Sequence, residues 1–205
     1  MIRVPPPNEK LTEIIRKIGV KKLISIEINP YLPVDYQLIA KIAPNFCSVI
    51  WIARPNDSKN PRMLNPLIVS KELIRRGYTV LVHIPGIFYS RHEMKNILTI
   101  LKEYGIRNIF AMRGGGPWLK IKNADFSLAQ IFIEFIRDEF RGYFDIIIAG
   151  FPNVHPASNS MEQEMFFLRN KIVSGANIIL TQACMTPERY LNYKKYALCM
   201  LLIFR

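Results

Sequence analysis

The sequence has 205 residues, of which 50% are hydrophobic, and a formal net charge of +12 from 28 Lys and Arg against 16 Asp and Glu. A chain of this length suits one domain with one substantial core, so we predict a single domain over residues 1–205. The charge favours an anionic partner, which would be a nucleic acid, a lipid surface or a phosphate-bearing ligand. Because the basic residues are spread out and the densest sites are only pairs such as Lys21-Lys22, we predict no nucleic-acid binding.

The cysteines and the apolar runs argue against two further classes of protein. Cys47, Cys184 and Cys199 are far apart, odd in number and outside any CxxC pattern, so we expect neither a disulfide nor a metal site. The N-terminus lacks the apolar centre of a signal peptide, and no run reaches the roughly 20 apolar residues of a membrane-spanning helix. We therefore predict a cytoplasmic protein that does not enter a membrane.

Two kinds of apolar pattern alternate along the chain. Amphipathic stretches at helical spacing predict helices, and short runs rich in β-branched and aromatic residues predict buried strands. The predicted helices are Glu9–Ile18, Val34–Ala43, Pro66–Arg76, Arg91–Tyr104, Ala124–Phe140, Met161–Ser174 and Pro187–Ala197. The predicted strands are Lys22–Ile28, Phe46–Ile52, Thr79–Ile84, Asn108–Met112, Phe144–Ala149 and Asn177–Thr181. Glycines stand at the C-cap positions of five predicted helices, namely Gly19, Gly77, Gly105, Gly142 and Gly175.

The alternation of strands and helices predicts a parallel sheet with right-handed crossovers. Two architectures compete at this point, an open doubly wound sheet and a closed eight-stranded barrel. Six βα units supply only part of a barrel, which usually needs about 250 residues.

Polar residues gather where the predicted strands end, which is where ligands bind in either architecture. Glu27 lies in the first strand, His83 in the third, Arg113 after the fourth, His155 in the segment after the fifth, and Gln182 after the sixth. An acid, two imidazoles, a guanidinium and an amide would thus share one rim. This pattern favours a site there.

Each of these residues also has a structural interpretation. Glu27 in an apolar strand is either paired with a lysine or is a proton donor with a raised pKa. His83 is either a hydrogen-bonded core histidine or a ligand contact, and His155 belongs either to a turn or to a ligand-facing loop. Arg113 before three glycines favours an anion site, because its planar guanidinium suits phosphate. The glycines form neither a GxGxxG nor a GK[ST] motif, so a Rossmann or P-loop assignment is weak.

In sequence order, four segments resemble the methylenetetrahydrofolate reductase family. Ser25–Pro30 corresponds to the family's Ser-Phe-Glu-Phe-x-Pro-Pro, and Asn108–Pro117 to its Asn-Ile-Leu-Ala-Leu-Arg-Gly-Asp-x-Pro. Ala149–Ala157 corresponds to Ala-Gly-Tyr-Pro-x-x-His-Pro-Glu-Ala, and Leu168–Gln182 to Leu-Lys-x-Lys-Val-x-Ala-Gly-Ala-x-x-x-Ile-Thr-Gln. The last two segments are specific, and the resemblance runs from about Lys22 to Tyr196.

The resemblance implies a TIM-type (β/α) barrel, here incomplete with about six βα units, that holds FAD at the C-terminal strand ends. NAD(P)H would reduce the flavin, which would reduce methylenetetrahydrofolate to methyltetrahydrofolate for methionine biosynthesis. By position, Glu27 would be the proton donor and Gln182 would bind the pterin of the folate substrate. The implied cofactor-binding residues are Arg113 and Lys171, which would hold the flavin phosphates, with His83, Gly114, His155 and Glu164.

The sequence departs from the family pattern at several of these places. The motif acid is replaced by Gly115, a flavin-contacting threonine by Ile50, and the motif tyrosine by Phe151, while only His83 remains of a His-Leu-Thr-Cys segment. The chain also ends before a seventh and an eighth strand, which would leave sheet edges for a partner chain or a homo-oligomer to cover. Two alternatives to an active reductase therefore stay open: a non-catalytic relative that binds flavin, folate or a partner protein, and an incomplete product without a stable fold.

Overall fold

The structure, a computed structural model, describes residues 8–19, 23–52, 60–115, 123–156, 158–184 and 186–202. Lys22, Gly116, Pro117 and Ala157, which belong to predicted strands or motif segments, lie outside these ranges. Six strands form one parallel sheet: β1 Ser25–Ile28, β2 Phe46–Val49, β3 Val80–Pro85, β4 Asn108–Met112, β5 Asp145–Gly150 and β6 Ile178–Thr181. The helices are α1 Leu11–Ile18, α2 Tyr36–Ile42, α3 Asn65–Arg75, α4 Arg91–Glu103, α5 Ala129–Phe140, α6 Met161–Val173 and α7 Pro187–Leu202, with short 3-10 turns η2 Pro61–Met63 and η3 Gly86–Phe88.

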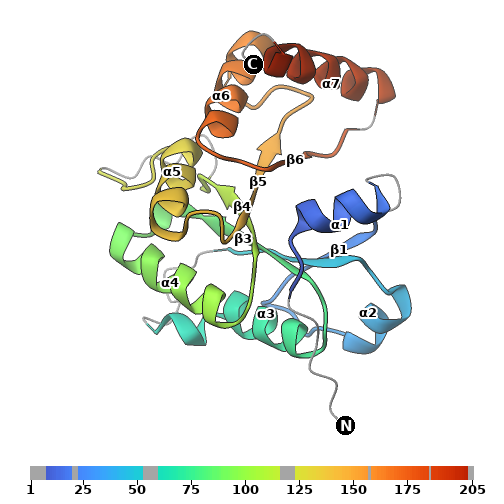
Figure 1. Cartoon of the computed structure of the whole chain (residues 1–205), viewed down its shortest axis with the longest axis vertical. Helices are drawn as coiled ribbons and strands as arrows, with labels where there is room; N and C mark the ends of the chain where they lie inside the picture. Colours follow the sequence, from blue (N-terminus) through green and yellow to red (C-terminus); the bar gives the residue numbers. More distant parts are fainter. Residues whose placement is uncertain are drawn as a thin grey trace.

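The strands are neighbours in chain order, β1-β2-β3-β4-β5-β6, and every neighbouring pair is parallel. The sheet is curved, and α2 to α7 lie on its outer side (Figure 1). A doubly wound sheet would reverse its strand order at a switch point, and this sheet has no reversal. The structure therefore confirms the prediction of an incomplete TIM-type barrel with six βα units.

Side-chain alternation divides the sheet into an outer and an inner core. Val80, Val82 and Ile84 of β3 pack outward with the helices, while Leu81 faces inward with Phe110 and Ile147 of the strands beyond. α1 adds Leu11 and Ile14 to the inner core, so this helix packs against the concave side of the sheet.

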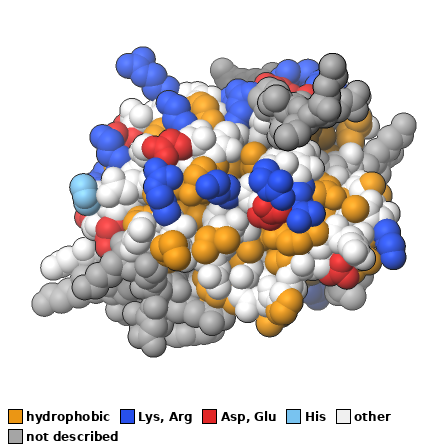
Figure 2. Space-filling model, turned by 90° about the horizontal axis from the view of Figure 1, so that it is seen from below, with side chains coloured by type: hydrophobic (Ala, Val, Ile, Leu, Met, Phe, Trp, Pro, Cys, Tyr) orange, Lys and Arg blue, Asp and Glu red, His pale blue; other side chains and the backbone are white. Residues whose placement is uncertain are grey.

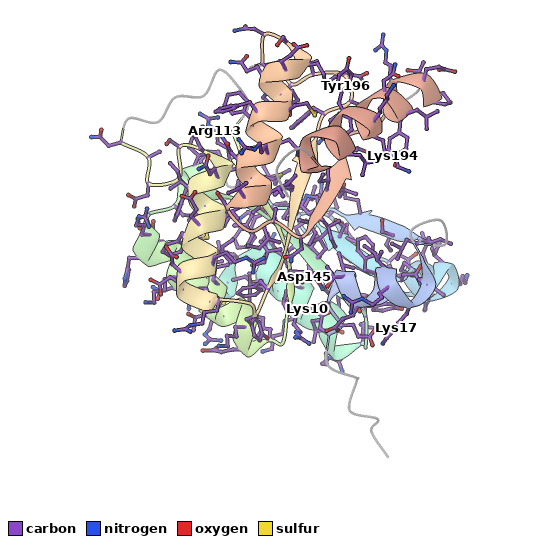
Figure 3. The ribbon with its side chains drawn as sticks, turned by 45° about the horizontal axis from the view of Figure 1, so that its top comes forward. Lys10, Lys17, Arg113, Asp145, Lys194 and Tyr196 are labelled. Atoms are coloured by element: carbon purple, nitrogen blue, oxygen red, sulfur yellow. The ribbon has the colours of Figure 1, made fainter. Side chains whose placement is uncertain are left out.

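Two side chains at the start of the strands, Asn108 and Asp145, hold α1 in place. Asn108 Oδ1 accepts from Leu11 N at 2.8 Å, and Asp145 Oδ2 accepts from Thr12 N at 2.8 Å and Thr12 Oγ1 at 2.6 Å. Lys10 Nζ lies 3.8 Å from Asp145 Oδ1, and Figure 3 shows these two side chains together. The strand residues thus satisfy N–H groups at the first turn that have no partner within the helix. Since α1 covers the N-terminal end of the strands, a site has room only toward their C-terminal end.

Most predicted elements agree with the structure within a few residues, but the start of α5, the end of α7 and most of the predicted C-caps were wrong. α5 begins at Ala129 instead of Ala124, because Asp125 accepts the Arg91 N–H at the start of α4 and Phe126 is fully buried in the core. Of the glycines predicted as C-caps only Gly19 is one, and the C-caps of α3, α4, α5 and α6 are the residues directly before the predicted glycines, namely Arg76, Tyr104, Arg141 and Ser174. Arg141 has φ 49°. The Arg137 guanidinium donates to the Arg141 carbonyl at 3.0 Å and so helps to hold this residue at its positive φ.

Positive charge is concentrated in one part of the described chain. Residues 60–115 contain nine Lys and Arg against three Glu. Figure 2 shows a row of Lys and Arg side chains across the face seen from below, where α3 and α4 lie in Figure 1. None of the helices within the described ranges has the length and apolar character needed to span a bilayer.

Candidate functional site at the C-terminal rim

The C-terminal ends of the six parallel strands form one rim, and the residues predicted to form a site lie along it. Glu27 is in β1 and His83 in β3, while Arg113 and Gln182 directly follow β4 and β6. His155 lies in the loop between β5 and α6. Some of these side chains come from neighbouring strands and others from strands far apart, because β1 and β6 are opposite edges of the sheet.

His83 is a buried member of the inner face. Its side chain keeps only 8% of its surface exposed, its Nε2 lies 2.6 Å from Ser48 Oγ, and its ring packs edge-on against Phe110 at 4.7 Å between centroids. Burial lowers the pKa of His83 to about 4, so the imidazole is neutral at pH 7. The structural interpretation of His83 as a hydrogen-bonded core histidine fits this geometry, and a ligand contact through its second nitrogen remains compatible with it.

Arg113 holds the loop that follows β4. Its Nε donates to the Ser127 carbonyl at 3.0 Å and its Nη1 to the Gly114 carbonyl at 3.1 Å. Gly114 has φ +83°, and a Cβ there would lie 2.4 Å from the Pro85 Cβ, so only glycine lets the ends of β3 and β4 approach this closely. The guanidinium is thus fixed at the rim by main-chain contacts, a geometry that suits anion binding.

Glu164 is almost completely buried, at 2% exposure, behind the loop after β5. Its Oε2 accepts from Ser158 Oγ at 2.9 Å and from the His155 main-chain N–H at 3.3 Å. The His155 ring packs edge-on against Phe151 at 4.6 Å. The carboxylate therefore fixes the loop that carries His155, a contact that the sequence did not predict.

Lys171 fills a gap between two strands. Pairing of β4 with β5 ends at Phe110 and Ile147, so the Ala149 carbonyl on the β4 side has no strand partner. Lys171 Nζ donates to this carbonyl at 2.9 Å. Burial lowers the pKa of Lys171, and the nearby charge of Glu164 opposes that shift. The ammonium lies 5.8 Å from the centroid of the Phe151 ring.

Tyr193 of α7 is a rim residue that sequence analysis missed. It is 2% exposed, and a Cβ on Gly150 would lie 2.4 Å from its hydroxyl oxygen and 2.7 Å from Ile179 Cγ2. Burial raises the pKa of Tyr193, and the charge of Glu164 raises it further. The only signal in the sequence is the glycine at the end of a strand, which permits close approach of another residue.

Glu27 and Gln182 lie at opposite ends of the rim. Six strands give five steps of about 4.8 Å, or about 24 Å measured around the sheet. Both side chains are exposed, and the Gln182 N–H donates to the Gly150 carbonyl at 2.8 Å. The expectation of a buried Glu27 was wrong because β1 is an edge strand, and no ion pair within the described ranges includes this carboxylate. A ligand or another protein surface would have to cover this edge of the sheet to remove the Glu27 side chain from water.

Fold and rim together define a (β/α)-barrel protein with a candidate ligand site at the C-terminal strand ends. A solved structure named "QR15, an Aldolase" has a TM-score of 0.53 with 13% sequence identity, covers 100% of both chains and so supports the fold alone. A family model described as methylenetetrahydrofolate reductase matches residues 27–200. The chain belongs to the methylenetetrahydrofolate reductase family.

Two bacterial relatives indicate how much of the family this chain spans. The 5,10-methylenetetrahydrofolate reductase of Pectobacterium carotovorum subsp. carotovorum is 31% identical over 195 residues, which cover 91% of this chain and 61% of the relative. The protein of the same name from Salmonella typhimurium is 29% identical over 157 residues, covering 76% of this chain and 50% of the relative. The chain therefore spans about half to three fifths of the length of these relatives.

Proposed function

We propose that this chain carries the flavin-dependent reductase chemistry of its family. FAD would bind at the C-terminal rim, NAD(P)H would be the co-substrate, and 5,10-methylenetetrahydrofolate would be reduced to 5-methyltetrahydrofolate. The observation that carries this proposal is the match over residues 27–200, with Glu27, Arg113 and Gln182 retained at strand ends. Glu27 would supply a proton to the folate, and the Gln182 amide would orient the pterin through hydrogen bonds.

The side chains at the rim suit a flavin diphosphate. Arg113 is held by two main-chain carbonyls, so little side-chain entropy remains to be lost when its guanidinium binds phosphate. Burial disfavours the charged form of Lys171, and a phosphate beside it would favour that form again. Bound FAD would supply a carrier that accepts hydride from the nicotinamide and passes it to the folate. The protein would bind, orient and exclude water around these groups.

A second candidate function is a relative that binds flavin, folate or a partner protein without turnover. The observation that favours it is Gly115, which stands where the family motif has an aspartate and offers neither charge nor a side-chain hydrogen bond.

FAD titration of the purified protein, followed by flavin absorbance and fluorescence, tests the common part of both functions. The wild-type protein should take up FAD, and Arg113→Ala should weaken binding about 10- to 100-fold, as expected for loss of a hydrogen bond to a charged group. Arg75→Ala is the matched control, since it removes the same charge from α3 in a side chain that is 69% exposed. No spectral change with the wild-type protein would refute the cofactor assignment.

NAD(P)H oxidation by the FAD-loaded protein separates the two functions. With menadione as electron acceptor, turnover above the free-flavin control supports the reductase. FAD uptake without such turnover supports the non-catalytic relative.

A further inference from the structure

The inner face of the sheet contains a buried polar pair between two predicted site strands. Ser48 of β2 is 6% exposed and His83 of β3 is 8% exposed, and Ser48 Oγ lies 2.6 Å from His83 Nε2. Phe110 of β4 packs on one side of the imidazole, and Glu27 of β1 is the register partner of Ser48 on the other side. Of these neighbours only Glu27 carries a charge.

The direction of this hydrogen bond follows because the proton of the buried Ser48 hydroxyl requires an acceptor. Within the described ranges, Ser48 Oγ has His83 as its one hydrogen-bond partner. A buried hydroxyl must donate its own proton, because an unpaired buried donor costs free energy. If Nε2 carried a hydrogen, two donors would face each other or the hydroxyl proton would be left unpaired. Ser48 Oγ–H therefore donates, and Nε2 is the acceptor.

The same argument places the single imidazole proton. A neutral imidazole has one N–H, and an Nε2 that accepts leaves this N–H at Nδ1. Nδ1 makes no hydrogen bond within the described ranges, while the residue keeps some accessible surface. Its N–H can therefore reach a ligand on the inner face.

We propose that Ser48 is a positioning residue that fixes His83 as the Nδ1–H tautomer and so presents a hydrogen-bond donor toward the C-terminal rim. The ligand class that fits is one with an acceptor atom, such as a carbonyl oxygen or an unprotonated ring nitrogen of a heteroaromatic ring system. That this ligand is FAD rests on the proposed function. The tautomer itself depends only on the protein.

A hydroxyl bonded to an imidazole also occurs in nucleophilic enzymes, and two observations argue against that role here. Ser48 is buried at 6% exposure and its hydroxyl is bonded to His83, so a substrate carbonyl has little access to it. Burial also lowers the pKa of His83 to about 4, which makes it a poor acceptor for the proton of an attacking serine.

Nitrogen-15 NMR of the imidazoles tests the tautomer in the protein without ligand. The chain has three histidines, His83, His92 and His155, so a His83→Asn variant assigns the signals of interest. The wild-type protein should show a protonated Nδ1 and an unprotonated Nε2 for His83. Ser48→Thr should keep this pattern. Ser48→Val, whose side chain has the shape of threonine without the hydroxyl, should lose it. A protonated Nε2 in the wild-type protein would overturn the proposal.

FAD titration of the same pair of variants tests the ligand contact. Ser48→Val should bind FAD about fivefold more weakly than Ser48→Thr, in line with one neutral hydrogen bond. Equal affinities in proteins that fold equally well, as judged by circular dichroism melting, would overturn the donor role. If the wild-type protein binds no FAD, the proposed function fails together with this contact, while the NMR result decides the tautomer by itself. Ser48→Ala serves as a smaller substitution should both β-branched variants unfold.

Discussion

Gly115 has φ +77°, directly after Gly114 with φ +83°. Non-glycine residues rarely adopt such angles, but Asp and Asn tolerate them better than others. The acid of the family motif is therefore compatible with this loop at a modest conformational cost. The glycine removes a functional group without forcing the loop into a new shape.

Replacing Gly115→Asp should raise any residual NAD(P)H–menadione activity by at least about tenfold, because groups that stabilise a transition state by charge or hydrogen bonding contribute about 10²–10³ in rate. Gly115→Asn is the control, since it fits the same backbone without the charge. Unchanged activity of Gly115→Asp would contradict the role given to the acid.

Gly150 is required by the contact with Tyr193. Gly150→Ala should lower the free energy of unfolding by about 1–3 kcal/mol, because the added methyl group would overpack against the Tyr193 hydroxyl and Ile179. The double variant with Tyr193→Phe should recover part of this loss. Urea denaturation measures both, and a Gly150→Ala protein as stable as wild type would contradict the packing argument.

His83 should make stability depend on pH in the acid range. Burial lowers its folded-state pKa from 6.5 to about 4, so between these values the unfolded state binds more protons and stability falls as pH falls. At pH 4.5 the loss relative to pH 7 should be about 2.5 kcal/mol. Urea denaturation at both pH values should show this loss in wild type and a smaller one in His83→Asn. Parallel pH profiles of the two proteins would contradict it.

At the scale of elements, the N-terminal helix depends on residues far away in sequence. Asp145→Ala should lower the free energy of unfolding by about 2 kcal/mol, since it leaves the Thr12 N–H and hydroxyl without their acceptor. Asp145→Asn keeps one carbonyl oxygen and should lose less. Faster hydrogen exchange confined to α1 in Asp145→Ala would support the local origin of the effect. Protection of α1 equal to wild type would contradict it.

The sequence predicted elements well where the apolar pattern and the local turn chemistry agreed. β4 has its predicted bounds, and α4 and α6 start where predicted and end one residue early, because Ser90 and Ser160 cap their first turns. The start of α5 was predicted too early, because Phe126 is buried as part of the loop before the helix. The end of α7 was predicted too early, since the helix continues to Leu202. Local periodicity carries no information about such long-range packing.

At the scale of the whole molecule, both sheet edges expose apolar side chains. Ile24 beside β1 is 56% exposed, Leu180 of β6 is 40% exposed, and Leu191 and Leu198 of α7 are 59% and 49% exposed. Unpaired strand edges with apolar neighbours favour association, while the net charge of +12 opposes it. Salt screens the repulsion and leaves the apolar contacts in place.

We therefore expect self-association that increases with salt. Sedimentation velocity should show larger species at 0.5 M than at 0.05 M NaCl, and Ile24→Lys with Leu180→Lys should reduce them. Ile68→Lys is the control, because Ile68 is 46% exposed on α3, away from both edges. A monomer at every salt concentration would exclude the homo-oligomer.

The sequence alone determined that the fold is a parallel α/β sheet, and it placed Arg113, His155 and Gln182 after strands, while the barrel was implied by the family resemblance and the order of the strands was decided by the structure. The sequence could do so because period and strand direction are local properties, and parallel strands bring their C-terminal ends together. Only the tertiary structure decided that Glu27 is exposed, that Ser48 bonds His83, and that Glu164 and Lys171 support the loop and strand end near Phe151. Burial and side-chain partners arise when distant segments pack, and no short stretch of sequence encodes them.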